Sequence, residues 1–331
     1  MAGANSNIQI TDLDFNTLKT NLKKYLQSQD TLKDYNYEGS ALSTLLDVLA
    51  YNTQYNAYYL NMVANEMFLD SAIQRSSVVS HAKLLNYTPR SAVAPSATIT
   101  LKINQVTQSS LTLPKFTSFL SEAIDGVNYK FVTTDDITIN TNQANNTVTF
   151  TDLTIKQGEP TTLNFAYSLA ENPSSIIDLP DTNIDTTTIS VVVQQSNSNS
   201  SSEVFTLAEN FLTLDSSSAV YFLQEGNKEN YQIYFGDGIL GKALTDGNQI
   251  IVSYITTNAS ASYGANNFVL MDTIAGYSNT TITPITATTQ GSDKETIDSI
   301  KYTAPKAYSS QGRAVTKEDY IYQIQNNSGI F

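Results

Sequence analysis

The sequence predicts an α+β fold, with an N-terminal helical region, β-rich middle domains and short C-terminal helices. Helical periodicity ends near Pro95 and returns only after residue 290, whereas the chain between these points alternates as strands do. The composition agrees with a β-rich centre, since 40% of the residues are hydrophobic, only 15% are charged and 20 are Tyr. At 331 residues the chain is long enough for two or three domains.

The most informative segment is a single long helix expected over residues 41–70. On a helical wheel at about 100° per residue, apolar side chains gather on one side: Leu42, Leu46, Leu49, Leu60, Val63 and Met67. A second apolar group lies nearly opposite: Tyr51, Tyr55, Tyr58, Met62 and Leu69. Only a narrow stripe is consistently polar: Ser43, Asp47, Gln54, Asn61 and Asn65.

A helix that is apolar on two sides must be covered on two sides. About thirty residues make a rod of roughly 45 Å, longer than a small domain is wide. Because few neighbouring helices are expected within the chain, we predict an interface helix covered by other chains. Its predicted contact residues are Leu42, Leu46, Leu49, Tyr51, Tyr55, Tyr58, Leu60, Met62, Val63 and Met67.

The alternative is that this helix is the central helix of a helical domain. The two interpretations differ in what the isolated chain would bury. As the centre of a domain, the helix would already hide five test residues within the chain: Leu46, Leu49, Tyr55, Leu60 and Met62. As an interface helix, it would bury them only when neighbouring chains are present.

Shorter helices are expected on either side. Leu13–Ser28 and Ala72–Asn86 have amphipathic patterns, and Ser40 and Ser71 are the expected N-caps of the second and third helices.

The C-terminal segment is also expected to be helical. A capping box of Ser292 and Glu295 predicts a helix that Pro305 ends, and Thr316 with Asp319 predicts the start of another. This last helix carries no stop signal before the sequence ends, so we expect the natural chain to continue.

Strand signals begin at Ala97, where apolar residues alternate with Thr98, Thr100 and Lys102. Short strand-like runs recur as far as residue 255. Ser196–Ser202 is an unbroken run of Ser and Asn and is expected to be an exposed loop. The patterns divide the chain into an N-terminal helical region, a first and a second β-rich domain and a C-terminal helical segment: residues 1–93, 94–170, 171–290 and 291–331.

Charge and composition exclude several classes of protein. The net charge is −13 and no basic run occurs, so we expect no nucleic-acid partner. Cysteine is absent, which excludes disulfides and thiolate chemistry. We see neither a secretory signal nor an apolar run long enough for a membrane, so we expect a soluble protein made in a cytoplasm, without a membrane partner.

We find no catalytic constellation and expect no enzyme activity, cofactor or metal. His81 is the single histidine and is expected to have a packing or surface role. Asp135 and Asp136 precede a strand and are expected to form a turn. A glycosidase needs two carboxylates that converge across a cleft, and the spacing of the acidic residues does not indicate such a pair.

The sequence Phe235-Gly236-Asp237-Gly238 lacks the residues of a P-loop or a dinucleotide fingerprint. We predict a tight structural turn with a positive φ at Gly236 or Gly238, in which Asp237 accepts hydrogen bonds from nearby backbone N–H groups. A calcium site at Asp237 is the open alternative, although the alternating acidic ligands of a calcium loop are missing.

Eight stretches resemble a known family when they are taken together. The first four resemble the N-terminal part of the large baseplate wedge subunits of contractile-tailed phages: residues 34–40, 45–53, 61–70 and 75–79. The other four resemble the baseplate J-like family, which contains those subunits: residues 234–241, 291–295, 304–305 and 312–320. Their structural motif residues are Gly236, Asp237, Gly238, Gly241, Arg313, Asp319 and Tyr320.

The resemblance implies a structural role in the virion, in a tail baseplate that assembles in the host cytoplasm. It implies four kinds of partner: a second copy of the chain, an elongated partner wedge subunit held through the N-terminal helices, a small lysozyme-like wedge subunit, and neighbouring wedges in a ring. Members of this family are longer than 331 residues.

Two other classes remain open. A carbohydrate-binding or glycosidase tailspike would suit the Ser-, Thr- and Asn-rich strands, but Trp, a favoured sugar-stacking residue, is absent. An exported adhesin-like β protein would suit the acidity and the absence of Cys, but no signal segment is seen.

Overall fold

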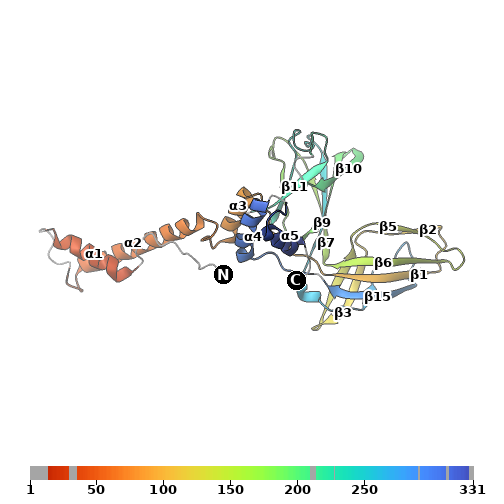
Figure 1. Ribbon diagram of the computed structural model, residues 1–331, viewed down its shortest axis with the longest axis horizontal. Coiled ribbons are helices and arrows are strands. Elements are labelled where there is room, and N and C mark those ends of the chain that lie inside the picture. Colours follow the sequence, from red (N-terminus) through yellow and green to blue (C-terminus); the bar gives the residue numbers. More distant parts are fainter. Residues whose placement is uncertain are drawn as a thin grey trace. The chain divides into compact units, whose positions relative to one another are not determined.

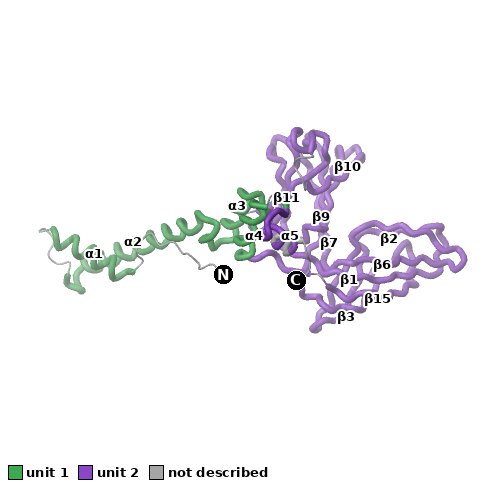
Figure 2. The backbone as a smooth tube through the Cα atoms, viewed as in Figure 1, with its two compact units in different colours: residues 1–87, 297–313 green, residues 88–296, 314–331 purple. Residues whose placement is uncertain are grey.

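The computed structural model describes residues 14–29, 36–208, 214–226, 228–289, 291–310 and 313–327. The predicted α+β class is confirmed, because helices occupy the N-terminal region and the C-terminal segment and strands fill the middle (Figure 1). The chain forms two compact units, residues 1–87 with 297–313 and residues 88–296 with 314–331 (Figure 2).

The first unit is helical. Its described elements are α1 (Phe15–Gln27), α2 (Ala41–Glu66), α3 (Arg75–Leu84) and α4 (Ile297–Ser310). Ser40 caps α2 as predicted, since its hydroxyl accepts a hydrogen bond from Ser43 N at 3.0 Å. A small core joins α3 to α4, from the far end of the sequence: Ala72, Val78, Val79, Ala82, Ile300 and Ala304.

The helix ends differ from the sequence prediction. Ser71 does not cap α3, because its hydroxyl donates to Asn65 O at 2.7 Å. The N-cap position of α3 is held by Gln74, without a side-chain cap. The carboxylate of Glu66 accepts from Ile73 N at 2.9 Å and so stabilises the turn that separates α2 from α3.

The predicted capping box before α4 is wrong. Glu295 accepts a hydrogen bond from Arg90 N at 3.0 Å, so its carboxylate is engaged outside the helix. Pro305 lies inside α4 and does not end it. A proline removes one intrahelical bond, but Ile300 and Ala304 hold this part of α4 in the core against α3.

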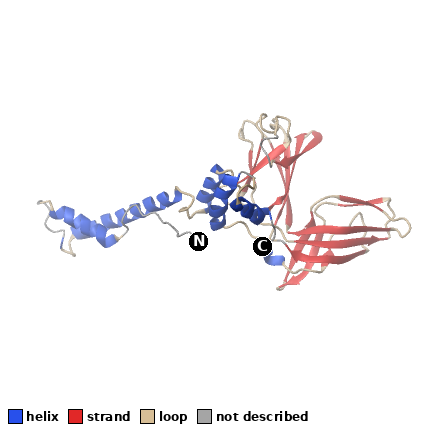
Figure 3. Cartoon of the chain, in the orientation of Figure 1, coloured by secondary structure: helices blue, strands red, loops and turns tan. Residues whose placement is uncertain are grey.

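The second unit contains a six-stranded sheet in the order β14-β3-β4-β6-β1-β15. The strands of this unit are red in Figure 3. Its strands are β1 (Ser96–Asn104), β3 (Ser118–Ile124), β4 (Val127–Thr133), β6 (Thr147–Gln157), β14 (Phe268–Leu270) and β15 (Thr280–Thr289). A two-stranded sheet of β2 (Ser110–Leu113) and β5 (Ile137–Asn140) shares its core. The predicted alternation holds, since Ile99, Leu101 and Ile103 are fully buried.

A seven-stranded sheet has the order β7-β13-β9-β10-β11-β12-β8. Its strands are β7 (Glu159–Ala166), β8 (Ile176–Asp178), β9 (Ile184–Ser196), β10 (Asn199–Leu207), β11 (Val220–Glu225), β12 (Tyr231–Phe235) and β13 (Gln249–Thr256). Part of the expected loop Ser196–Ser202 is therefore strand. Its side chains are polar and largely exposed, and Ser202 pairs with Gln194 through the backbone.

The strand pairing does not follow chain order, because β15 pairs with β1 and β14 pairs with β3. The predicted domain boundaries remain predictions.

The last helix, α5 (Lys317–Asn327), begins as predicted, with Thr316 N donating to Asp319 Oδ2 at 2.8 Å. None of the helices within the described residues is both long and apolar enough to span a membrane.

Candidate functional site

The most unusual surface of the first unit is the exposed part of α2. Large apolar side chains along this helix remain open to solvent, and Leu60 for example is 49% exposed. We define the α2 apolar surface as Leu45, Val48, Leu49, Tyr51, Tyr55, Tyr58, Tyr59, Leu60, Met62, Val63 and Met67. Such a concentration of apolar residues on one helix is typical of an interaction site.

Four of the five test residues are therefore exposed in the isolated chain: Leu49, Tyr55, Leu60 and Met62. This contradicts the central-helix interpretation at those positions. Leu46 was expected to be exposed as well, and that expectation is wrong, because Leu46 is only 4% exposed. Of the other predicted contact residues, Leu42 is half-buried.

The covered side of α2 is its polar and small side. Its buried residues are Ser43, Leu46, Ala50, Ala57, Asn61, Ala64 and Asn65. Lys19 of α1 forms an ion pair with Asp47 of α2 across 2.5 Å. A surface helix normally turns its apolar stripe inward, whereas α2 leaves most of its large apolar side chains outward.

Tyrosines form an ordered ridge within the α2 apolar surface. The Tyr51 hydroxyl donates to the Tyr55 hydroxyl at 2.8 Å, and their ring centroids lie 4.6 Å apart in an edge-on arrangement. Tyr59 extends the ridge, with centroids 6.3 Å from Tyr55 and 6.0 Å from Tyr58. Aromatic rings fixed by one another offer contact area at little entropic cost.

The glycine motif forms the predicted tight turn. Gly238 has a φ of +86°, and Asp237 Oδ1 accepts from Ile239 N at 2.9 Å and from Leu240 N at 3.0 Å. These backbone hydrogen bonds lower the pKa of Asp237 below its usual value. Gly236 is required for a different reason, since a Cβ there would lie 2.3 Å from the backbone carbon of Gly241.

This turn is tied to a neighbouring loop by backbone hydrogen bonds. Gly241, whose φ is +86°, donates through its N–H to Asp215 O at 3.0 Å. Lys242 N donates to Ser218 O at 2.8 Å. The tip of the turn carries an apolar side chain outward, because Ile239 is 74% exposed. The arrangement is a rigid corner.

The remaining predicted residues do not gather at one place. Arg313 and Tyr320 are exposed, and Asp319 caps α5. His81 Nε2 lies 2.9 Å from Glu66 O, which agrees with the expected packing role. Within the described residues, no group of three or more His, Cys, Asp or Glu side chains is placed to hold a metal ion.

A polar cavity of about 770 Å³ opens in the second unit. The three carboxylates that line it are already engaged. Glu159 pairs with Lys130 at 2.8 Å, Asp181 accepts from the Tyr254 hydroxyl at 2.6 Å, and Asp272 accepts from Ser118 N at 2.7 Å. Glycoside hydrolysis needs two converging carboxylates, one of which donates a proton, and this arrangement does not favour it.

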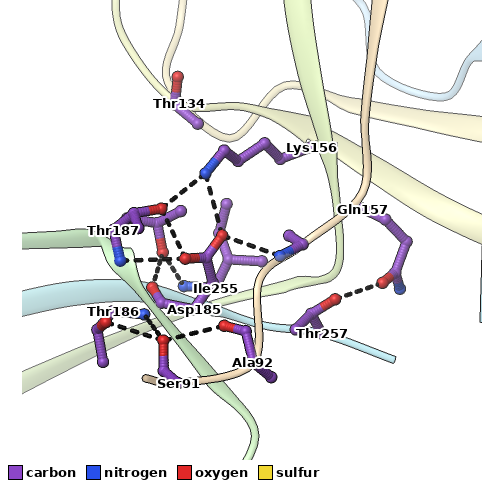
Figure 4. A network of polar contacts seen from close by, with 12 residues as sticks. Ser91, Ala92, Thr134, Lys156, Gln157, Asp185, Thr186, Thr187, Ile255 and Thr257 are labelled. Atoms are coloured by element: carbon purple, nitrogen blue, oxygen red, sulfur yellow. Dashed lines mark hydrogen bonds and ion pairs between the residues drawn. The ribbon is translucent and has the colours of Figure 1, made fainter. Parts of the chain in front are cut away.

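Sequence reasoning missed a buried polar centre at Asp185, which is 0% exposed (Figure 4). Its Oδ2 atom accepts from Lys156 Nζ and from Ala94 N, both at 3.0 Å. Its Oδ1 atom accepts from the hydroxyl of Thr187 at 2.6 Å and from the N–H of the same residue at 3.0 Å. One carboxylate thus binds β6, β9 and the connecting segment before β1.

A second contact lies beside this centre. The Ser91 hydroxyl and the Thr186 hydroxyl are 2.8 Å apart, and Thr186 N donates to Ser91 Oγ at 3.1 Å. The Asx turn between Asp185 and Thr187 was the one local signal that could have revealed the centre.

Comparisons with known proteins bear directly on α2. Residues 14–87 match the model of a family described as "Baseplate wedge protein gp6-like, helical domain". The helical region is similar to a gp6-like baseplate wedge domain. The matched segment contains α1, α2 and α3, and with them the whole α2 apolar surface.

The similarity extends beyond the helical region. The chain is 30% identical to baseplate wedge protein gp6 of Enterobacteria phage T4 over 343 aligned residues, which cover 95% of this chain and 50% of that protein. The chain therefore spans about half the length of this curated relative. The narrower likeness to the baseplate J-like family stays a prediction.

Two solved baseplates are distantly similar. The anti-feeding prophage baseplate matches with a TM-score of 0.33 and 12% identity, covering 94% of this chain and 56% of the matched chain. The type VI secretion TssK-TssF-TssG baseplate subcomplex matches with a TM-score of 0.23 and 10% identity, covering 74% and 48%. At these TM-scores neither match supports an argument.

Proposed function

We propose that this chain is a structural, non-enzymatic component of the baseplate wedge of a contractile phage tail. The observation that carries the proposal is the α2 apolar surface, which lies in the segment similar to the gp6-like helical domain. Fully burying a large apolar side chain is worth about 1.5–3 kcal/mol. Covering several such residues gives a strong drive for assembly, part of which offsets the entropy of ordering the partners.

In this proposal α2 is the shared element of a helical bundle. Its partners are a second copy of the chain and an elongated partner wedge subunit, which cover the two apolar sides. The second unit contacts the small lysozyme-like wedge subunit and neighbouring wedges, so that the wedges close into a ring. The protein works in the virion, in a baseplate assembled in the host cytoplasm, and its β region belongs to the baseplate J-like family.

The mass of the purified chain tests this function, alone and mixed with the other tail proteins of its phage. We expect a stable complex larger than the single chain, because the α2 apolar surface is costly to leave in water. A single-chain mass in every mixture would contradict the proposal.

The tailspike alternative predicts ligand binding at Asp237 instead. Calorimetric titrations with calcium and with bacterial surface polysaccharide distinguish the two functions. We expect no saturable heat, because Asp237 Oδ1 is already engaged by Ile239 N and Leu240 N. Saturation at micromolar affinity, lost in Asp237→Ala, would favour the tailspike.

A further inference from the structure

The two large sheets of the second unit end in four edge strands, and three of these edges are protected. Unpaired edges invite pairing with other chains, and proteins blunt them with short strands, proline or covering groups. β14 has only three residues. β8 is equally short, and its Ile176 backbone is covered by the side chain of Asn172, whose Nδ2 donates to Ile176 O at 2.6 Å and whose Oδ1 accepts from Ile176 N.

The edge of β15 is blunted by a proline at its middle. Asn104 N donates to Asn279 O at 3.0 Å, which fixes the alternation of the ladder between β1 and β15. With this alternation, Pro284 faces away from β1, toward the free edge. Because proline has no N–H, another strand cannot continue a regular ladder there.

The fourth edge, β7, is open. Tyr167 N donates to Asn248 O at 2.8 Å, so odd-numbered residues of β7 bond to β13 and even-numbered residues face outward. Its own proline, Pro160, blunts only the start of the strand. The outward backbone groups of Thr162, Asn164 and Ala166 pair with none of the described residues.

The same stretch is the least charged part of this edge. No charged residue occurs between Glu159 and Glu171, in a chain whose net charge is −13. Two copies can therefore approach each other here with little electrostatic repulsion. Leu163 and Phe165 are half-buried and lie at the rim of the core of the seven-stranded sheet, so part of each remains to be covered.

We propose that two copies of the chain pair edge to edge through β7, antiparallel about a twofold axis at Asn164. In this register Thr162 lies opposite Ala166 of the second copy. Leu163 and Phe165 of the two copies then meet in non-hydrogen-bonded pairs, where side chains lie closest. In the same register Glu159 lies opposite the uncharged residue Leu169. This inference rests on the proposed pairing of two copies and adds β7 as a second surface, besides α2, through which the two copies meet.

Asn164→Cys tests the register directly, because the chain contains no other cysteine. Hydrogen-bonded antiparallel residues have Cα atoms about 5.5 Å apart, within the range that a disulfide spans. We expect mild oxidation to give a disulfide-linked dimer on non-reducing gels. Thr283→Cys is the matched control, since it is exposed on the β15 edge beside Pro284 and is expected to stay unlinked.

Asn164→Pro provides a second test of the β7 surface. It removes only an outward N–H and leaves the bonds of Phe165 to β13 intact, as Pro284 does in β15. We expect an unchanged thermal melting profile and at least a tenfold weaker self-association, measured by light scattering across a concentration series.

The outcomes separate this surface from the proposed function. If the wild-type chain dimerises, Asn164→Cys links no better than the control and Asn164→Pro still dimerises, the β7 surface is wrong and pairing occurs elsewhere. If the wild-type chain stays a monomer and Asn164→Cys does not link, the pairing of two copies fails as well. If the chain is a monomer alone but Asn164→Pro blocks its entry into complexes with other tail proteins, β7 binds a different partner and the second-copy proposal is overturned.

Discussion

Lys156 Nζ lies 3.0 Å from Asp185 Oδ2, and this ion pair joins the six-stranded sheet to the seven-stranded sheet. The Asp185 side chain is fully buried, whereas that of Lys156 keeps 20% of its exposure. Ala94 N donates to the same carboxylate oxygen. The carboxylate of Asp185 therefore holds together the two sheets and the segment that leads into β1.

Asp185→Ala should destabilise the second unit by about 3 kcal/mol, since it leaves a lysine and buried N–H groups without their partner. Urea denaturation measures the change. Glu203→Ala is the control, because it breaks the exposed pair with Lys242 and should cost less than about 1 kcal/mol. Equal effects of the two substitutions would mean that Asp185 is not the joint between the sheets.

Leu60→Asp should leave the fold intact and block assembly, because Leu60 is already half exposed in the single chain. Burying an unpaired carboxylate in an apolar contact costs several kcal/mol by order of magnitude, which opposes association. Circular dichroism checks that the fold is intact, and incorporation into baseplates measures assembly. Ser80→Asp adds the same charge at an exposed polar position of α3, outside the α2 apolar surface, and should assemble normally. Normal incorporation of Leu60→Asp would place that residue outside any interface.

The two central glycines of the turn after β12 should respond differently to alanine. Gly238→Ala should lower the free energy of unfolding by about 1 kcal/mol, because φ is +86° at this position. The cost should be no larger, because the new Cβ would lie 3.6 Å from Ala243 Cβ, which is an ordinary contact. Gly236→Ala should cost more, because its Cβ would overlap the backbone of Gly241. Thermal melting ranks the two variants, and the reverse order would contradict the geometry of this corner.

Alkaline pH should weaken the second unit in a defined window. Burial raises the pKa of Tyr221 to about 12, whereas the same residue in the unfolded chain titrates near 10. The unfolded chain therefore loses its proton first, and stability is complete below about pH 10 and falls as the pH rises toward about 12. The loss from this residue is on the order of 2–3 kcal/mol.

Denaturation from about pH 9 to about pH 12 measures this dependence. Tyr221→Phe should reduce the slope without abolishing it, since burial also raises the pKa of Tyr234 and Tyr254. An unchanged slope in Tyr221→Phe would show that this hydroxyl is not the group responsible.

Much of the local structure followed from the sequence, because caps and alternation are local signals. Ser40 begins α2, and Ile99, Leu101 and Ile103 point into the core as their spacing predicts. The pairing of β15 with β1 had no such signal, since it depends on which distant strand completes the sheet. Asp185 was missed for the same reason, because its partners Lys156 and Ala94 come from separate segments.

The candidate site was only partly predictable. The helical wheel found both apolar sides of α2, but it could not tell which positions the chain itself covers. Leu46 is buried while Leu49 and Leu60, on the same predicted side, are exposed. Burial along a rod varies with the neighbour that reaches each turn, and α1 is much shorter than α2. The periodicity of α2 alone does not show how far α1 extends along it.

The central claim is that other baseplate chains cover the α2 apolar surface. Oxidative footprinting of the free chain and of intact tails measures the labelling of Tyr55, Met62 and Met67 in both states. We predict strong labelling in the free chain, where all three are exposed, and protection in the assembled tail, with exposed Tyr37 as an internal reference. Equal labelling of these residues in the two states would contradict the account.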